Sequence, residues 1–131
     1  MKKIGTLNQP LSSIIAGMGH GDMLVIADCG LPIPPEVMRL DLALTSGVPG
    51  FLETLAVVQQ ELQVESVIIA NEMVENSLEL YKKIQPMIGN ITIEMISHDE
   101  FKELSQQAVA VVRTGECTPY ANIILKSGVI F

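Results

Sequence analysis

Two histidines, His20 and His98, are the side chains of this sequence that change charge near neutral pH, so they are the first candidates for proton transfer. His20 lies between two glycines in the segment Gly19–Asp22, just after an expected helix. The flanking glycines leave the imidazole ring open to approach. Two interpretations stay open here: a proton carrier for a bound substrate, or an exposed loop histidine with no chemical role.

A second group of candidates begins at an expected helix N-terminus. Ser97 and Glu100 have the spacing of a capping box, which predicts a helix from His98 to about Gln106. Lys102 follows His98 by one turn, so both side chains share a helix face that points to a cleft or to solvent. The alternative to a binding role is a solvated polar face.

The remaining candidates lie in two predicted loops. Asp28 follows an apolar strand, at the place where ligands collect in an open α/β sheet. The loop Arg113–Asn122 brings the phenol of Tyr120 close to the amide of Asn122, and both groups recognise hydroxyls through directional hydrogen bonds. Each residue also has a structural alternative: a turn carboxylate for Asp28, packing for Tyr120, and a bond to nearby backbone for Asn122.

Several reaction classes lack their characteristic residues. The sequence has no supportable Ser-His-Asp order, no phosphate-binding glycine loop and no convincingly spaced pair of carboxylates. Its two cysteines, Cys29 and Cys117, and its two histidines do not follow the spacings of a structural zinc site, so we expect reduced thiols and no metal. What remains is a set of acid/base and uncharged hydrogen-bonding groups, suited to moving protons on a neutral, polyhydroxylated substrate.

The overall composition restricts the partners. The chain has 131 residues, with 15 acidic and 8 basic side chains and a formal charge of −7, which disfavours nucleic acid and anionic membranes. No apolar run reaches the ~18 residues of a membrane-spanning helix. A mean hydropathy of +0.39 is high for so small a domain and predicts apolar subunit interfaces. The polar residues after Lys3 interrupt any signal sequence, so we expect a cytoplasmic protein.

These candidates need a framework, and residues 1–131, taken as a single domain, alternate between helix and strand patterns. Helices are expected from Asn8 to Met18, over 51–62, from a cap at Asn76 to about Pro86, and over 98–106. Strands are expected over 23–28, 40–44 (half exposed or at an edge), 66–70, 91–95 and 108–112, before β-favouring endings at 123–125 and 129–131. The alternation predicts an α/β fold with three α/β/α layers around a mainly parallel or mixed sheet.

Five ordered segments carry a resemblance to a known family. They are Met1-Lys2-Lys3-x-Gly5-x-Leu7-Asn8, Met18-Gly19-His20-x-Asp22, Ile26-Ala27-Asp28-x-Gly30-Leu31-Pro32, Ser97-His98-x-Glu100-Phe101-Lys102 and Arg113-Thr114-Gly115-Glu116-x-Thr118-Pro119-Tyr120-Ala121-Asn122. With the apolar ending Gly128–Phe131, this set resembles the ribose pyranase / fucose mutarotase family over nearly the whole chain.

The resemblance implies a cofactor-independent enzyme that interconverts β-D-ribopyranose and β-D-ribofuranose, with D-ribose as its substrate. His20 matches the position of the family's proton donor. The residues that match sugar-binding positions are Asp28, His98, Lys102, Tyr120, Ala121 and Asn122. Family members form ring-based decamers with sites at subunit boundaries, which agrees with the apolar composition.

An expected strand separates two of these residues. A straight strand over 23–28 spans roughly 17 Å at ~3.3 Å per residue, which puts His20 and Asp28 at opposite ends. Unless the loop 19–22 folds back along a shorter strand, we expect neighbouring subunits to share each site. Two other functions stay open: mutarotation of L-fucose or another monosaccharide, because sugar choice depends on pocket shape, and a non-catalytic oligomeric sugar-binding protein.

Overall fold

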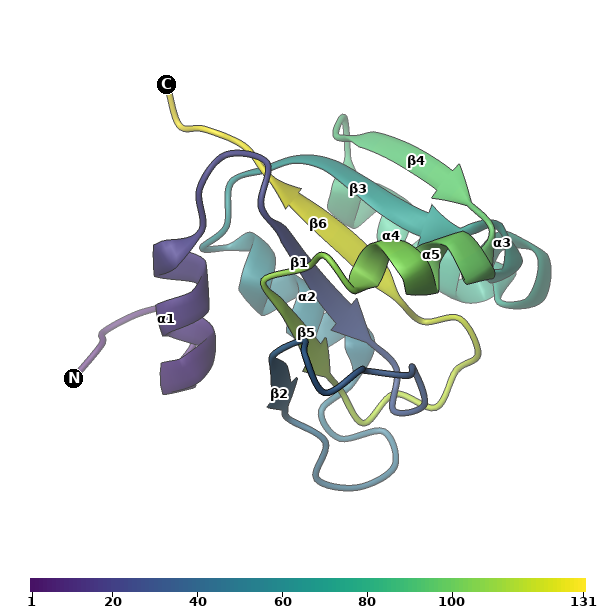
Figure 1. The fold of residues 1–131 in the computed structure, drawn as a ribbon, viewed down its shortest axis with the longest axis horizontal. Helices are drawn as coiled ribbons and strands as arrows, with labels where there is room; N and C mark the ends of the chain where they lie inside the picture. The colour runs from purple at the N-terminus through teal and green to yellow at the C-terminus, as the bar shows by residue number, and fades with distance from the viewer.

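The computed structural model describes all residues from 1 to 131, and helices and strands alternate along most of the chain (Figure 1). The helices are α1 (Gln9–Gly17), α2 (Phe51–Gln59), α3 (Asn71–Asn76), α4 (Leu78–Ile88) and α5 (His98–Ser105). The strands are β1 (Met23–Ala27), β2 (Arg39–Asp41), β3 (Val64–Ala70), β4 (Thr92–Ile96), β5 (Ala110–Arg113) and β6 (Ile123–Ser127). All six strands belong to one sheet with the order β2-β5-β1-β6-β3-β4.

Five strands of the sheet run in one direction, and β6 runs against them. β1 pairs in parallel with β5, β5 with β2, and β3 with β4. β6 lies between β1 and β3 and pairs antiparallel with both. The expectation of a mainly parallel or mixed sheet is confirmed, and the sheet is mixed.

The alternating side chains of β1 show how the two faces of the sheet are covered. Leu24 and Ile26 point into the larger core, to which α1, α2 and α4 contribute. Val25 and Ala27 point into a smaller core, where Phe101 of α5 packs. In Figure 1, α5 crosses the near face while α2 and α4 lie behind the sheet. These four β1 residues are fully buried, as their continuous apolar run predicts, and the three-layer α/β/α arrangement is confirmed.

Two predicted helix starts are confirmed at the level of single hydrogen bonds. Asn8 Oδ1 accepts the backbone N–H of Leu11 at 3.0 Å, which caps α1. At α5, Ser97 Oγ accepts the N–H of Glu100 at 3.2 Å, and a Glu100 carboxylate oxygen accepts the N–H of Ser97 at 2.9 Å. This capping box makes His98 the first residue of α5 and fixes the position of its backbone.

The alternating segment 40–44 forms a shorter strand than predicted. β2 has three residues, lies at the edge of the sheet and buries only Leu40. It ends at Asp41, whose carboxylate accepts the N–H of Ala43 at 3.0 Å and pairs with Arg113 of β5 at 3.1 Å. The predicted edge position is confirmed, and Leu44 beyond the strand is exposed.

The prediction that a helix begins at a cap on Asn76 is wrong. A separate six-residue helix, α3, ends at Asn76, and α4 begins only at Leu78. The Asn76 amide donates to the carbonyl of Glu72 within α3 and caps no helix start. The prediction missed α3 because this helix follows β3 without a loop. α4 also continues two residues past Pro86, since a proline in the last turn loses only one helical hydrogen bond.

The other predicted elements are present, with boundaries that differ by a few residues. The apolar ending is an exception, because β6 ends at Ser127 and residues 129–131 form no strand. The N–H of Gly128 still donates to the carbonyl of Gln63 at 2.8 Å, and the side chains of the tail beyond it are exposed. None of the helices combines the length and apolar character that a membrane crossing requires.

Candidate functional site

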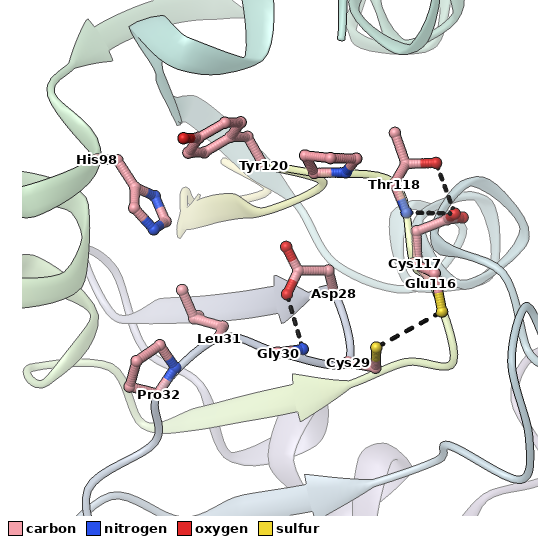
Figure 2. Close-up of a pocket in the computed structure, with 11 residues that line it drawn as sticks. Asp28, Cys29, Gly30, Leu31, Pro32, His98, Glu116, Cys117, Thr118 and Tyr120 are labelled. Carbon is pink, nitrogen blue, oxygen red and sulfur yellow. Dashed lines mark hydrogen bonds between the residues drawn. The ribbon is translucent and has the colours of Figure 1, made fainter. Parts of the chain in front are cut away.

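A cavity of about 370 Å³ opens where the loops after β1 and β5 meet the start of α5 (Figure 2). Because β1 and β5 are parallel, these loops come to the same edge of the sheet, which is the usual ligand position in such folds. Three of the predicted sugar-binding residues line the cavity: Asp28, His98 and Tyr120. The other walls come from residues 29–32 and 116–119.

Asn122 holds Asp28 in place from behind the cavity wall. Its Oδ1 accepts the backbone N–H of Asp28, and its Nδ2 donates to Asp28 Oδ2, both at 2.9 Å. The other carboxylate oxygen of Asp28 accepts the N–H of Gly30 at 2.9 Å. Asn122 is 1% exposed, and its neighbour Ala121 is fully buried. Neither residue lines the cavity of this chain, so Asn122 acts here through Asp28.

His98 and Tyr120 meet edge to face beside the cavity, with ring centroids 5.0 Å apart and ring planes at 84°. Tyr120 is the only non-glycine residue with a positive φ, at 61°, a conformation that bulky residues rarely adopt. The Ser77 hydroxyl donates to the carbonyl of Pro119 at 2.6 Å and ties this loop to the α3–α4 junction. His98 Nδ1 is buried without a hydrogen-bond partner. An unpaired buried group costs free energy, and a binding or catalytic role is one explanation for keeping it.

His20 lies at the opposite end of β1 and does not line the cavity. Its Nε2 is 2.7 Å from one carboxylate oxygen of Glu65 in β3, and the other oxygen is 3.5 Å from Nζ of Lys126 in β6. The hydrogen bond from His20, together with the charges of His20 and Lys126, outweighs desolvation and lowers the pKa of Glu65. The chain therefore separates His20 from Asp28 by the length of β1, as expected.

Lys102 does not line the cavity with His98. Its ammonium pairs with the carboxylate of Asp99 on the same helix at 2.9 Å, and this hydrogen bond lowers the pKa of Asp99. Lys102 lines a neighbouring depression that also contains Arg39, with Pro32 at the boundary between the two hollows. The α5 face thus presents His98 and Lys102 to two different hollows.

Glu116 is a site residue that the sequence did not indicate as one. One carboxylate oxygen accepts the backbone N–H of Phe51, the first residue of α2, at 3.1 Å. The other accepts the hydroxyl of Thr118 at 2.8 Å and its N–H at 3.2 Å. Burial opposes ionisation, but these hydrogen bonds outweigh burial and lower the pKa of Glu116. Glu116 and Phe51 are 65 residues apart, so no local pattern reveals the contact.

The cavity presents a set of directional polar groups. No three or more His, Cys, Asp or Glu side chains gather into a metal-binding group. The lining includes two carboxylates, one imidazole, one phenol and one threonine hydroxyl, beside the apolar side chains of Leu31 and Pro32. Several hydrogen-bonding groups next to a small apolar surface suit a compact molecule with several hydroxyls.

The fold and the cavity together define a small-molecule site at the carboxyl ends of parallel strands in a three-layer α/β/α protein. The sequence matches the RbsD / FucU transport protein family over residues 1–130, and the chain belongs to that family. The resemblance that the five sequence motifs indicate is therefore confirmed.

Known relatives match along their whole length. The chain is 58% identical over 131 residues to a protein named D-ribose pyranase from Clostridium perfringens (strain SM101 / Type A), with 100% of both chains covered. It is 51% identical, with the same coverage, to a D-ribose pyranase from Symbiobacterium thermophilum. A solved structure of Bacillus subtilis RbsD complexed with D-ribose has a TM-score of 0.97, 49% identity and 100% of both chains covered. A fucose mutarotase from Streptococcus pneumoniae, solved with L-fucose, has a TM-score of 0.84, 27% identity and the same coverage.

Proposed function

We propose that this chain is a cofactor-independent isomerase that interconverts β-D-ribopyranose and β-D-ribofuranose. The observation that carries this function is full-length similarity to proteins named D-ribose pyranase, at up to 58% identity, together with a similar structure that holds D-ribose. The cavity chemistry agrees, because ribose is a small, neutral molecule with several hydroxyls.

The reaction moves protons and exchanges one ring oxygen for another. Opening the pyranose removes a proton from the anomeric hydroxyl and delivers one to the ring oxygen, while the bond between the anomeric carbon and that oxygen breaks. The hydroxyl on carbon 4 then attacks the aldehyde carbon and gives up its proton, while the aldehyde oxygen takes up a proton and becomes the anomeric hydroxyl of the furanose. No atom is gained or lost, and positioned acid/base groups typically accelerate such steps 10²–10⁴-fold.

His20 is the proposed proton carrier. An ionised carboxylate only accepts hydrogen bonds, so the contact with Glu65 puts a hydrogen on Nε2 of His20. Nδ1 is then the ring nitrogen that takes a proton from the sugar as a base and returns one as an acid. The flanking glycines of the His20 loop carry no side chain that would block this nitrogen.

The other predicted residues are proposed to bind the sugar. Asp28 accepts hydrogen bonds from sugar hydroxyls, while His98 and Tyr120 fix the ring from the second wall of the cavity. Asn122 and the Ala121 backbone support that wall, and Asn122 keeps the Asp28 carboxylate oriented. Lys102 lies in the adjacent depression and reaches the sugar only if it leaves Asp99.

The distance between His20 and Asp28 leads us to propose that two subunits share each site. A mean hydropathy of +0.39, which is high for so small a domain, supports apolar contacts between subunits. Leu7, Ile130 and Phe131 are 78%, 89% and 100% exposed in the single chain. We propose a homo-oligomer, a decamer by family resemblance, in which His20 of one subunit meets the cavity of another.

A cytoplasmic location is also proposed. Two cysteines in 131 residues is not the disulfide-dense composition of small secreted domains, which suits a reducing compartment.

Mutarotation of L-fucose is the second candidate, favoured by the structural similarity to a fucose mutarotase. A non-catalytic sugar-binding role is the third. Magnetisation-exchange NMR on equilibrated ribose and on fucose separates them. We expect the wild-type protein to accelerate exchange for ribose and not for fucose, and His20→Ala to abolish the acceleration. Faster exchange of fucose alone would favour the second candidate, and ribose binding without exchange the third. An undiminished rate in His20→Ala would reject His20 as the proton carrier.

A further inference from the structure

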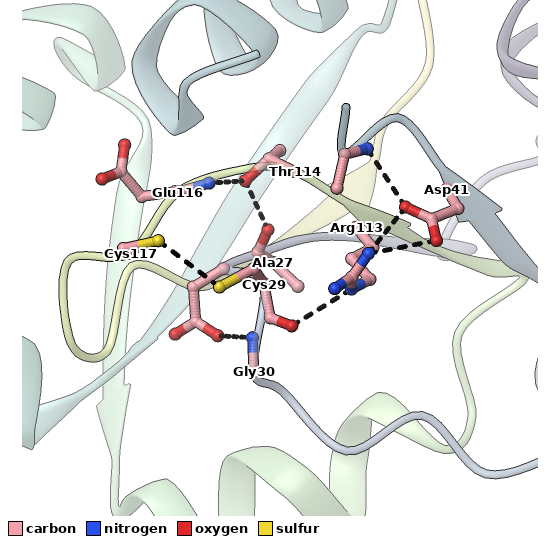
Figure 3. A network of polar contacts seen from close by, with 10 residues as sticks. Ala27, Cys29, Gly30, Asp41, Arg113, Thr114, Glu116 and Cys117 are labelled. Atoms are coloured by element: carbon pink, nitrogen blue, oxygen red, sulfur yellow. Dashed lines mark hydrogen bonds and ion pairs between the residues drawn. The ribbon is translucent and has the colours of Figure 1, made fainter. Parts of the chain in front are cut away.

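Two cysteines that the proposed reaction does not use face each other at the cavity wall (Figure 3). The sulfur atoms of Cys29 and Cys117 are 3.6 Å apart, although 88 positions separate them in the sequence. Both residues line the cavity. The backbone N–H of Cys29 donates to the carbonyl of Glu116 at 2.8 Å, so a hydrogen bond already joins the two loops beside the thiols. A disulfide needs this closeness of the two backbones.

The two thiols differ in their surroundings. Cys117 is exposed, and its sulfur lies 3.2 Å from the hydroxyl of Ser46. Hydrogen bonds from Ser46 and from Cys29 lower the pKa of Cys117. The hydrogen bond with Cys117 and burial raise the pKa of Cys29. An exposed thiol with a lowered pKa beside a second thiol is the arrangement of an attacking and a resolving cysteine.

We propose that peroxide oxidises Cys29 and Cys117 to a reversible disulfide, and that this modification weakens sugar binding in the cavity. The Cys117 thiolate attacks one oxygen of hydrogen peroxide and the O–O bond breaks. Hydroxide is the leaving group, and Cys117 becomes a sulfenic acid. The Cys29 sulfur then attacks the Cys117 sulfur, the S–O bond breaks, and the oxygen leaves as water with the Cys29 proton. The hydroxide takes up the proton that Cys117 released, so two thiols and one peroxide give one disulfide and two waters.

The disulfide would alter the cavity because each cysteine stands near a residue that lines it. Cys29 directly follows Asp28, and Cys117 precedes Tyr120 in the β5–β6 loop. Drawing the sulfurs together shifts both loops and removes the contact of Cys117 with Ser46. A misplacement of about 1 Å can cost about 100-fold in rate, so we expect the ribose exchange rate to fall by about 10- to 100-fold. This part of the inference rests on the proposed function.

The experiment oxidises the purified full-length chain with hydrogen peroxide and digests it without reductant. Mass spectrometry should find the Cys29 and Cys117 peptides linked and two hydrogens lighter than the separate peptides. The ribose exchange rate should fall by about 10- to 100-fold, and calorimetry should show a lower ribose affinity. Dithiothreitol should restore them, whereas it does not reverse methionine sulfoxide, so recovery assigns the loss to reversible cysteine oxidation and the linked peptide identifies the disulfide.

Two variants serve as matched controls, each compared with its own untreated sample. Cys117→Ser should keep its rate in peroxide because the attacking sulfur is absent. Cys29→Ser should accumulate a sulfenic acid on Cys117 that dimedone labels. Absence of the linked peptide in the wild type, links between subunits only, or a linked protein with unchanged ribose affinity would overturn the proposal.

The mass spectrum and the ribose measurements distinguish a failure of this inference from a failure of the proposed function. If the reduced protein neither binds nor converts ribose, the proposed function fails and the predicted effect on sugar binding fails with it. The mass spectrum still decides whether the disulfide forms.

Discussion

Asn122→Ala tests whether a buried amide holds the Asp28 carboxylate for sugar binding. The substitution removes two hydrogen bonds of 2.9 Å, one to the backbone N–H of Asp28 and one to its carboxylate. A neutral hydrogen bond contributes about 1 kcal/mol and one to a charged group about 1.5–3 kcal/mol. Because Asn122 is 1% exposed, bulk water does not replace these bonds directly. We expect the free energy of unfolding to fall by about 3 kcal/mol, roughly 100-fold in the folding equilibrium.

Urea unfolding, followed by circular dichroism, measures this loss at a fixed subunit concentration, because the stability of an oligomer depends on concentration. Calorimetry on the same samples gives the Kd for ribose. It should rise about tenfold if the freed carboxylate loses one charged hydrogen bond to the sugar, worth about 1.5 kcal/mol. Asn76→Ala is the matched control, since its exposed amide makes one hydrogen bond, to the carbonyl of Glu72 at 3.1 Å. It should cost less than about 0.5 kcal/mol and leave the Kd unchanged.

A loss in Asn122→Ala no larger than in Asn76→Ala, or an unchanged Kd for ribose, would refute this reasoning. Asn122→Asp covers the case in which the alanine variant does not fold. It keeps an oxygen for the Asp28 N–H but replaces the donor with a second carboxylate oxygen. The two carboxylates repel when both are ionised, so its stability deficit should grow between about pH 4 and about pH 7.

Two further substitutions, Glu116→Gln and Gly115→Ala, test contacts of the loop that follows β5. Glu116→Gln should cost about 1–2 kcal/mol at neutral pH, because neutral bonds replace bonds to a carboxylate. The pKa of Glu116 is lowered, so its contribution is full above its ordinary value of 4.5 and is lost as pH falls through the folded-state value. Unfolding curves of the two proteins should therefore differ at pH 7 and converge in acid; equal stability at pH 7 would contradict the contact. Gly115→Ala puts a Cβ 2.5 Å from the carbonyl oxygens of Thr45 and Val48 and should cost more than about 2 kcal/mol. In Gly17→Ala the Cβ meets nothing within 4 Å, so thermal unfolding should find that variant unchanged or up to about 1 kcal/mol more stable; similar losses in both would contradict the steric argument.

The parts of the fold that sequence patterns predicted are the ones that local physics determines. Asn8 and the pair Ser97–Glu100 satisfy free N–H groups within their own first turn, so they indicate α1 and α5 without knowledge of the rest of the chain. The continuous apolar run of β1 likewise predicts that this strand is buried on both faces of the sheet. The start of α4 failed because Asn76 is equally able to end one helix or to begin another.

The parts that the sequence did not predict depend on contacts between distant segments. Asp28, His98 and Tyr120 share a cavity because β1 and β5 are parallel neighbours beside α5, and the residue types alone did not say that Asn122 binds Asp28. Glu65 meets His20 because β1 and β3 both run antiparallel to β6, which places the starts of these two strands at the same edge of the sheet. The sequence identified the polar groups of the site, and the topology determines which of them meet within one chain.

Mixing two inactive variants tests the shared site most directly. Subunits of His20→Ala and of Asp28→Asn are unfolded together, refolded as a one-to-one mixture and assayed for ribose exchange. If each site takes His20 from one subunit and Asp28 from another, about one quarter of the sites in randomly mixed oligomers have both residues intact. Exchange should then recover to about one quarter of the wild-type rate, while each variant refolded alone stays inactive. A co-assembled mixture that remains as inactive as its components would contradict the shared site.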